Sequence, residues 1–364
     1  MPISLDELRR FAVARSLFPP TTLKRALHHL GFVQADPIRA PARAQDLILR
    51  HRVKGYRAGD LERRYAELDV HEDFFINYGF VTRELQALMH PRFNSRVTAQ
   101  GRLGRRKRAE LVLEFVRQRG VVHPQEVDRH FGHGTVKKWG GKSNATTDLL
   151  DAMHYQGLLR IPGRAAGIRL YAVHEHAPGP NDEAARIAAI DALVDAVVHV
   201  YAPMPASRLR YLVRRLESAA PQWRSKLTKA FQRALERMSH ANLDGIEWYW
   251  PADETPTNAA PQESVRLLAP FDPVVWDRDR FRLLWNWEYR FEAYTPLKKR
   301  IRGYYALPML WRDRVIGWGN LSIQNGELKA ELGYVDSNPP KGPSFQHELD
   351  AELERLRAFL GLKG

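Results

Sequence analysis

The first fifty residues carry apolar side chains at helical spacing, and this pattern predicts two short helices. Ser4 and Glu7 form a capping box that opens the first helix, which ends near Ser16. The second helix has an apolar stripe over residues 23–30 and stops at Gly31, a residue type that favours the end of a helix. Two short helices this close together, followed by a third, are typical of a helix-turn-helix core.

The clearest pattern lies over residues 103–176, where three predicted helices precede two short strands. The third of these helices spans residues 144–156, and a turn rich in Gly and Arg joins strands over 158–161 and 168–173. Helix, helix, helix and β-hairpin is the order of a winged helix, in which the third helix reads DNA and the hairpin forms the wing. Winged helices also serve as protein-binding modules, so DNA contact by this one stays open.

Two linkers that contain Pro divide the rest of the chain, at residues 177–181 and 252–261. The helices and the strand between them are consistent with a third winged helix. Beyond the second linker the pattern changes to short strands, among them residues 281–284, and Asn325-Gly326 predicts a two-residue hairpin turn. Such strands suggest a small β-barrel, closed by a helix over about 345–360. We therefore expect an α+β fold with tandem winged-helix (helix-turn-helix) domains over residues 1–100, 101–177 and 181–251 and a C-terminal β-barrel over residues 262–364.

The chain is basic, with 56 Lys and Arg against 42 Asp and Glu and a formal net charge of +14. Positive charge in this excess favours a polyanionic partner, because phosphates release condensed counterions when cations bind them. A generally basic protein without such a partner would show the same total. The position of the charges therefore matters more than their number.

Several classes of site are excluded by composition. The absence of Cys from 364 residues excludes disulfides, thiolate zinc sites, iron–sulfur clusters and cysteine nucleophiles. His28, His29, His130 and His133 are not accompanied by a metal-binding motif, so we expect no metal and no cofactor. No signal peptide and no apolar run near the roughly 18 residues of a membrane helix occur, which indicates a cytoplasmic protein that does not enter membranes. No dimerisation heptad is evident, and a monomer is expected.

The segment after Gly31 carries candidate chemistry. Gln34 and Asp36 are two residues apart in a short extended run, so their side chains project to the same face. A carboxylate beside an amide can hold the water molecule that a hydrolase needs, since the amide orients it and the carboxylate accepts its proton. Asp-Pro after a helix-ending Gly is also common turn chemistry, and this alternative stays open.

The same segment resembles a family of bacterial DNA glycosylases. The helix ends in Leu-Gly-Phe-Val, and Gln-x-Asp is followed by Pro-Ile, Arg43-Ala44 and the run Leu47–Arg50, a pattern similar to the AlkZ/YcaQ family. Later in the chain, LLAPFDPVVWDRDRF and TPLKKRIRGYYALPML look like the barrel of these proteins. The resemblance is thin over residues 68–100, where the family's Glu-Tyr-Trp-Ala-His-type run is missing. No role is therefore carried over to His71 or Glu72.

The resemblance implies a fold, an activity and a site. The fold is tandem winged helices with a C-terminal β-barrel, and the activity is hydrolysis of the N-glycosidic bond of N7- or N3-alkylated purines, including the unhooking of interstrand crosslinks. Gln34 and Asp36 fall on the catalytic motif in its Gln-x-Asp form. We expect a monofunctional DNA glycosylase of base excision repair, bound to double-stranded DNA and associated with the nucleoid, in which Asp36 is the general base and Gln34 positions the same water.

Basic residues in three regions are candidates for DNA contact. The helix start after Asp36 is a place where arginines can grip phosphate. The strip over residues 294–305 interleaves cations with Tyr294, Tyr304 and Tyr305. We expect phosphate contacts from Arg39, Arg43, Arg50, Lys142, Arg164, Lys298, Lys299 and Arg300.

A winged-helix transcriptional regulator, or an architectural protein without catalysis, is the alternative. A regulator binds intact DNA tightly and selectively, usually as a dimer with a fixed half-site spacing, and it turns nothing over. Three winged helices and a barrel in one chain favour the glycosylase.

Overall fold

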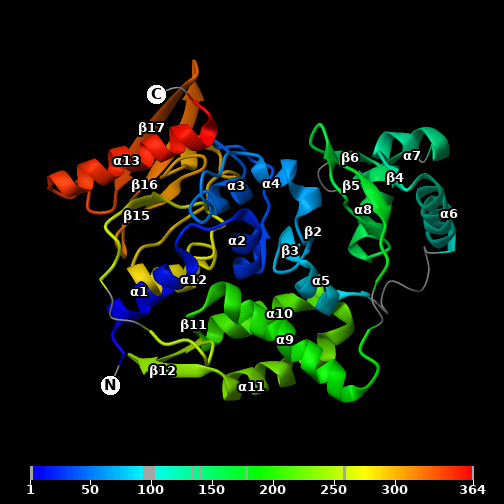
Figure 1. The fold of residues 1–364 in the computed structure, drawn as a ribbon, viewed down its shortest axis with the longest axis horizontal. Coiled ribbons are helices and arrows are strands. Elements are labelled where there is room, and N and C mark those ends of the chain that lie inside the picture. The colour runs from blue at the N-terminus through cyan, green and yellow to red at the C-terminus, as the bar shows by residue number, and fades with distance from the viewer. Residues whose placement is uncertain are drawn as a thin grey trace. The chain divides into compact units, whose positions relative to one another are not determined.

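The computed structural model describes residues 3–92, 103–132, 134–138, 141–176, 179–256 and 260–362, except for the side chains of 103–105, 136–138 and 141–143. Its elements are shown in Figure 1. The chain divides into two compact units. Unit 1 comprises Met1–Leu61, Val194–Leu212 and Gln232–Gly364, and unit 2 comprises Glu62–Leu193 and Val213–Phe231. Helices and antiparallel strands occur in both, so the fold is mixed α and β. The predicted domain boundaries stay a prediction.

Unit 1 begins with the two predicted helices, α1 (Leu5–Ser16) and α2 (Leu23–Leu30). The capping box is confirmed, since the Ser4 hydroxyl accepts the Glu7 N–H at 3.2 Å and the Glu7 carboxylate accepts the Ser4 N–H at 2.7 Å. α2 ends at Gly31, whose φ of +67° lies in the region that favours glycine. The next elements are β1 (Phe32–Gln34), α3 (Ala44–Leu49) and α4 (Asp60–Arg63).

A small antiparallel sheet follows later in unit 1. It has the strand order β11-β13-β12, with β11 at Met204–Pro205, β12 at Ser239–Leu243 and β13 at Ile246–Trp250. The chain between and before these strands forms α9 (Glu183–Tyr201), α10 (Ala206–Ala219), a 3₁₀ turn (Pro221–Lys226) and α11 (Leu227–Arg237).

The C-terminal sheet of unit 1 has four antiparallel strands in the order β14 (Val265–Leu267), β15 (Leu307–Trp311), β16 (Arg314–Gln324) and β17 (Glu327–Tyr334). Asn325 and Gly326 have φ values of +52° and +81°, so the predicted hairpin turn is confirmed. Among the described residues β14 and β17 do not pair with each other. The sheet is therefore a curled half-barrel and not the closed barrel that was predicted.

Helix α13 (Pro343–Leu360) lies across this sheet (Figure 1). Phe345 meets the rings of Trp311 and Tyr334, and the buried Glu352 carboxylate accepts the N–H of Leu267 at 2.9 Å. The C-terminal helix that the sequence predicted over about 345–360 is thus confirmed, and it packs on the sheet.

Residues 281–284 are helical, and the strand predicted there is wrong. They lie in α12 (Arg278–Trp285), which Asp277 caps by accepting the Arg280 N–H at 2.8 Å. Phe281, Leu284 and Trp285 are buried at spacings of three and four residues, which is the period of a helix. A four-residue apolar window is too short to distinguish this period from that of a strand.

Unit 2 begins with a 3₁₀ turn (Tyr65–Glu67), the hairpin of β2 (Val70–Phe74) and β3 (Tyr78–Thr82), and α5 (Arg83–Met89). The predicted three helices follow as α6 (Leu103–Arg119), α7 (Pro124–Phe131) and α8 (Ala145–Tyr155). An antiparallel sheet of order β4-β10-β7 accompanies them, with β4 at Val121–Val122, β7 at Leu159–Arg160 and β10 at Tyr171–Val173. Two hairpins complete the unit, β5–β6 (Thr135–Lys138 and Gly141–Asn144) and β8–β9 (Arg164–Ala165 and Ile168–Arg169).

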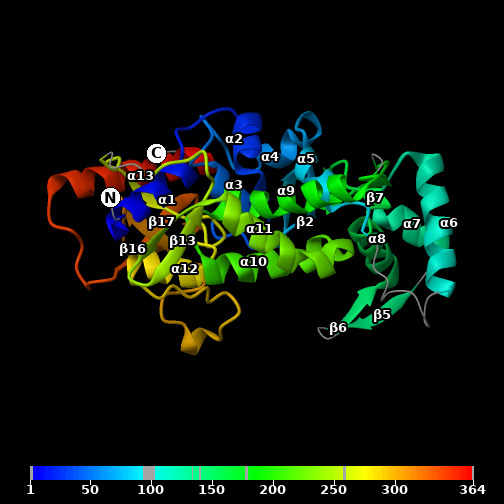
Figure 2. The same cartoon turned by 90° about the horizontal axis from the view of Figure 1, so that it is seen from below.

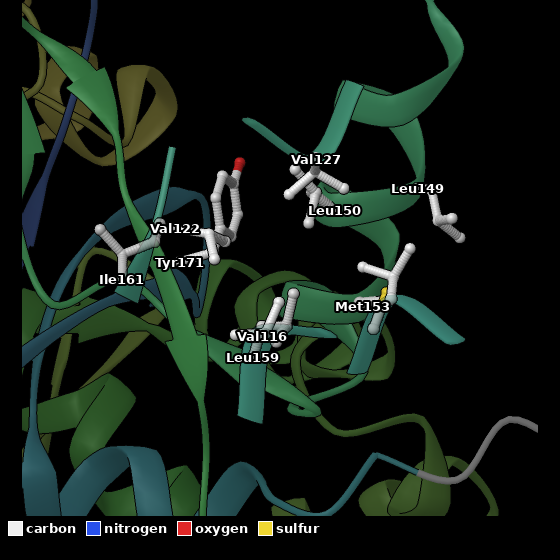
Figure 3. Packing of buried hydrophobic residues seen from close by; sticks show 10 residues of the cluster. Val116, Val122, Val127, Leu149, Leu150, Met153, Leu159, Ile161 and Tyr171 are labelled. Atoms are coloured by element: carbon white, nitrogen blue, oxygen red, sulfur yellow. The ribbon is translucent and has the colours of Figure 1, made fainter. Parts of the chain in front are cut away.

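The three helices and the three-stranded sheet of unit 2 share one hydrophobic core (Figure 3). Its members come from all three helices and from the strands: Val112, Val116, Val122, Val127, Leu149, Leu150, Met153, Leu159, Ile161 and Tyr171. Across the described part of the chain, no helix has the length and apolarity needed to cross a membrane.

Candidate active site

β1 positions the two predicted catalytic residues. Phe32, Val33 and Gln34 are all buried, and the strand ends at Gln34. Beyond it the Asp36 Oδ1 atom accepts the N–H of Ile38 at 2.9 Å, which is an Asx turn around Pro37. The turn chemistry that was the alternative reading is therefore present. It occupies one carboxylate oxygen of Asp36.

Gln34 is held by a tryptophan that lies 242 positions further along the chain, also in unit 1. The Gln34 Oε1 atom accepts the indole N–H of Trp276 at 2.6 Å. Because an indole nitrogen only donates, this contact determines which end of the amide is the oxygen. The Trp276 ring packs on Tyr201, with the ring centroids 5.3 Å apart. Contacts within the protein thus orient the Gln34 amide.

Asp36 is a half-buried carboxylate with no ion pair among the described residues. Burial raises its pKa above the ordinary value, and the Ile38 N–H offsets part of this rise. Asp73 in unit 2 is the contrast, because burial would raise its pKa, yet Arg92 at 2.8 Å and His90 at 2.7 Å hold it well below the ordinary range. A carboxylate that is taken out of water without a neutralising partner is typical of functional sites.

Two further residues of unit 1 influence Asp36 or are influenced by it. The Gln45 Oε1 atom accepts the Asp36 N–H at 3.4 Å. Tyr305 is buried, and burial, followed by the negative charge of Asp36, raises the pKa of its phenol. The site is therefore assembled from β1, from the turn after it and from residues of the C-terminal part of unit 1.

A buried ion pair fixes the N-terminal segment to the stretch that carries Trp276. Arg52 donates to the two carboxylate oxygens of Asp272 at 2.8 and 3.0 Å, and both side chains are fully buried. Arg52 also donates to the carbonyls of Ser16 and Ile48, each at 2.7 Å. Loss of either partner would leave an uncompensated charge in the interior, which is strongly destabilising.

The loop from Tyr289 to Tyr305 carries most of the predicted basic strip. Its base is held by the buried Glu292 carboxylate, which accepts the backbone N–H groups of Ile301, Arg302 and Gly303 at 2.7 to 3.2 Å. The loop projects from the rest of unit 1 after α12 (Figure 2). Tyr294, Leu297 and Ile301 are 81%, 76% and 68% exposed. Such an apolar tip on a basic loop is unusual for a surface that contacts only water.

The basic residues of this loop have different surroundings. Lys298 and Lys299 are exposed and form no ion pair with described residues. Arg300 donates to the Thr295 carbonyl at 2.8 Å and lies over the Tyr304 ring at 5.0 Å. Tyr305 is buried, so it is not a member of the exposed strip to which the sequence assigned it.

The other predicted DNA contacts differ in their exposure and in their partners. Arg39 is exposed without a partner among the described residues, and Arg43 is half-buried at the start of α3. Arg50 is 3% exposed and binds Glu352 and the Leu267 carbonyl, so its guanidinium is not available to phosphate and we withdraw it from the interface. In unit 2, Arg164 forms a bidentate pair with the buried Glu72 carboxylate. The side chain of Lys142 lies outside the described part of the structure.

Among the described residues, no group of three or more His, Asp or Glu side chains is arranged to hold a metal ion. His28 and His29 are exposed on α2. His133 lies outside the described residues.

Sequence reasoning missed the roles of Trp276 and Glu292. Trp276 lies in the first of the two later stretches on which the resemblance rests, so a signal was present there, and Glu292 lies between the two stretches. The pairing of Trp276 with Gln34 depends on long-range packing, which a linear pattern does not encode.

The fold is similar to a solved structure, the Streptomyces sahachiroi DNA glycosylase AlkZ. The TM-score is 0.61 and the sequence identity 14%, and the match covers 100% of this chain and 98% of the other. At this identity the match shows that the two proteins share a fold.

The sequence also matches the family described as DNA glycosylase AlkZ-like over residues 27–359, and the chain belongs to that family. The protein is accordingly a DNA-repair glycosylase, a hydrolase that binds DNA. The resemblance seen in the sequence is thereby confirmed.

Proposed function

We propose that the protein is a monofunctional glycosylase that removes N7- and N3-alkylated purines from double-stranded DNA, using a water molecule activated at Asp36 and oriented by Gln34. We extend the proposal to the unhooking of N7-linked interstrand crosslinks, because the scissile bond and the charged leaving group are the same. A winged-helix arrangement of the predicted domains, acting as a monomer, is part of the proposal.

The reaction requires few catalytic groups from the protein. N-glycosidic hydrolysis passes through a sugar with oxocarbenium character, which a nearby carboxylate stabilises. An alkylated purine already carries a positive charge, so its departure needs little acid catalysis. Asp36 would take a proton from water as the oxygen attacks C1′, and the electrons of the C1′–N bond would neutralise the leaving base. The pair offers no amine nucleophile, which favours simple hydrolysis over a covalent Schiff-base route.

One observation supports the assignment above the others. Asp36 is a half-buried carboxylate without a cationic partner among the described residues, and it follows two residues after Gln34, whose amide is held by Trp276. If the only role of the Asp36 carboxylate were to form the turn, full hydration or an ion pair would stabilise the folded protein further. Asp36 has neither, although it belongs to a protein with an excess of Lys and Arg.

The DNA interface that we propose includes Arg39, Arg43 and the exposed part of the Tyr289–Tyr305 loop. Lys298 and Lys299 would contact phosphates. The apolar tip formed by Leu297 and Ile301 suits insertion at a base step, since apolar wedges are used in this way by proteins that enter the minor groove. Lys142 stays a candidate in unit 2, and Arg164 would have to leave its pair with Glu72 to reach a phosphate.

The test is incubation with duplex oligonucleotides that carry N7-alkylguanine, N3-alkyladenine or a nitrogen-mustard crosslink, followed by alkaline strand scission. We expect abasic sites from wild type without added metal. A general base contributes about 10²–10⁴-fold, so Asp36→Asn should lower the single-turnover rate by that factor. Gln34→Ala should cost less, because an amide orients water and takes no proton.

Asp336→Asn is the matched control, since Asp336 is exposed and has no partner among the described residues. It should retain the wild-type rate. If Asp36→Asn cleaves the N7-alkylguanine duplex as fast as wild type, the catalytic assignment is wrong. Tight, sequence-selective binding of intact duplex with no base release from any substrate would instead favour the regulator or architectural protein.

A further inference from the structure

The Gln34 side chain ends in an amide, whose two ends have opposite hydrogen-bonding character. The Oε1 atom only accepts and the Nε2 atom only donates, yet the two ends have nearly the same shape. Rotation of the amide by a half turn about the last bond of the side chain therefore exchanges donor and acceptor with little change in packing. Gln34 is 8% exposed, but burial by itself does not select one of the two orientations. A hydrogen-bond partner has to select it.

Trp276 is a partner that can make this selection. Its indole nitrogen only donates, and it lies 2.6 Å from the Gln34 Oε1 atom. In the rotated amide the indole N–H would meet the hydrogens of Nε2, so a donor would face a donor and the indole would lose its acceptor. An unpaired donor away from water costs free energy, and the rotated amide is therefore disfavoured.

A tight turn holds the backbone of Trp276. The Trp276 N–H donates to the Asp272 carbonyl at 2.8 Å, and the Val274 N–H donates to an Asp272 carboxylate oxygen at 3.0 Å. The same carboxylate is bound by the buried guanidinium of Arg52. The indole is thus presented from a fixed backbone, and Gln34, at the end of a three-residue strand, is oriented against it.

Other indoles of unit 1 show that burial alone does not lead to such a contact. The indole nitrogens of Trp248 and Trp250 have no hydrogen-bond partner among the described residues. The indole nitrogen of Trp285 donates to the backbone carbonyl of Asp313 at 2.8 Å. Trp276, by contrast, is half-buried and donates to the side chain of a residue to which a catalytic role is assigned.

We propose that Trp276 is a positioning residue, which keeps the Gln34 amide in the one orientation that directs the reaction water. This inference rests on the proposed function and adds to its site a residue from a distant part of the chain. With Oε1 turned to the indole, Nε2 and its two hydrogens form the end of the amide that is turned away from Trp276. Trp276 makes and breaks no bond in the reaction, and its whole contribution passes through Gln34.

The experiment is Trp276→Phe, which keeps an aromatic ring beside Tyr201 and removes the N–H. Without this donor both orientations of the amide are populated. The single-turnover rate on N7-alkylguanine duplex should then fall about three- to tenfold, which is the effect of one lost hydrogen bond. The fall should not exceed that of Gln34→Ala, because Trp276 acts only through Gln34. The Kd for the duplex should stay within about twofold of the wild-type value, since the proposal concerns the chemical step.

A matched control separates positioning from a loss of stability. Trp285→Phe removes an indole N–H that donates to a carbonyl elsewhere in unit 1. Both variants should lower Tm by a few degrees, but Trp285→Phe should keep the wild-type rate of base release. If Trp285→Phe slows base release as much as Trp276→Phe does, the loss of rate reflects stability and the positioning role is wrong.

A measurement that leaves Trp276 intact tests the contact itself. The chain has 9 Trp residues, so the indole N–H signals of wild type and Gln34→Ala can be compared in a proton–nitrogen correlation spectrum. We expect one indole signal to move upfield and to exchange faster with solvent in Gln34→Ala, because its acceptor has been removed. An unchanged set of indole signals would show that the contact is absent in solution, and the proposal would be overturned.

A double variant shows whether Trp276 acts through Gln34. In that case Gln34→Ala combined with Trp276→Phe should be no slower than Gln34→Ala alone. The role of Trp276 is overturned, and the proposed function stands, if the two losses of rate multiply. The same holds if Trp276→Phe releases the base as fast as wild type while Gln34→Ala and Asp36→Asn are slow. If wild type releases no alkylated base, the proposed function fails and the role of Trp276 fails with it.

Discussion

The Asp36 carboxylate reduces the stability of the native state at neutral pH. Burial raises its folded-state pKa above the value in the unfolded chain, so the folded protein binds this proton more tightly. The sign follows directly. Above the folded pKa the ionised carboxylate costs stability, and below the ordinary Asp value of about 3.9 it costs nothing.

We therefore expect Asp36→Asn to raise the free energy of unfolding at pH 7.5. The amide keeps an oxygen for the Ile38 N–H and carries no charge to desolvate. The gain should be below about 1 kcal/mol because Asp36 is half-exposed and water screens its charge. This gain in the free energy of unfolding should shrink as the pH falls toward 4. Urea titrations of wild type and Asp36→Asn at pH 7.5 and at pH 4 measure the gain. A loss of stability in Asp36→Asn at pH 7.5 would show that Asp36 has a stabilising cationic partner.

Which residues of the site could be predicted from sequence depends on how far apart their partners lie. Gln34 and Asp36 were found because they are neighbours in one short motif. Trp276 was not found as the partner of Gln34, since no local pattern relates residues 242 positions apart. The same limit explains Arg50. Its position in a basic run predicted an exposed residue, but Glu352, 302 positions later, binds it in the interior.

At the scale of elements, the Tyr289–Tyr305 loop owes its shape to one buried carboxylate. Glu292 accepts three backbone N–H groups at the base of the loop, and bonds of this charge-assisted kind are stronger than neutral ones. The exposed cations and the apolar tip are thereby presented on a defined backbone.

The variant Glu292→Gln tests whether the Glu292 carboxylate holds the backbone of the loop. The amide has a single acceptor oxygen and no charge, so it cannot satisfy all three N–H groups. We expect faster hydrogen exchange at the amides of residues 301–303 and a several-fold rise in the Kd for duplex DNA. Glu288→Gln is the control, because Glu288 is exposed and pairs only with Arg290 among the described residues. Unchanged exchange in Glu292→Gln would mean that the loop is held by other contacts.

Elements with strong local signals were predicted well, and short apolar windows were not. The capping box at Ser4 and the Asn325-Gly326 turn are local, and both are confirmed. Residues 281–284 were mistaken for a strand because the cap at Asp277 and the next buried residue at Trp285 fall outside that window. The prediction of a barrel failed for a related reason. Alternation of apolar and polar residues within strands does not say whether the two edge strands of the sheet pair with each other.

At the scale of the whole molecule, the net charge of +14 predicts a steep salt dependence of DNA binding. A protein that neutralises about six phosphates should show a log-log slope near −5. Replacing both Lys298 and Lys299 by Ala should reduce the steepness by about 2, because each lost phosphate contact removes about 0.9. Fluorescence anisotropy with a labelled duplex over a salt series gives the slopes.

A second pair of lysines provides the control for net charge. Lys329 and Lys341 are exposed elsewhere in unit 1, and replacing both by Ala removes the same two charges. Their slope should stay near that of wild type. Equal slopes in both double variants would mean that total charge, and not the loop, attracts the DNA.

The family and the order of helices and strands over residues 103–176 could be predicted from the sequence, whereas the two compact units could not. Each unit takes segments that are separated in sequence, and linker composition marks only where the local pattern changes.

The salt link between Arg52 and Asp272 sets a lower limit on how small this enzyme can be made. A fragment that ends before residue 260 would still contain Gln34 and Asp36. It would lack Asp272, so the buried guanidinium of Arg52 would have no counter-ion, and it would lack Trp276, so the Gln34 amide would not be oriented. The Gln-x-Asp motif lies within the first forty residues, but Trp276 follows Gln34 by 242 positions and Asp272 follows Arg52 by 220, so the motif is complete only when both distant residues are present.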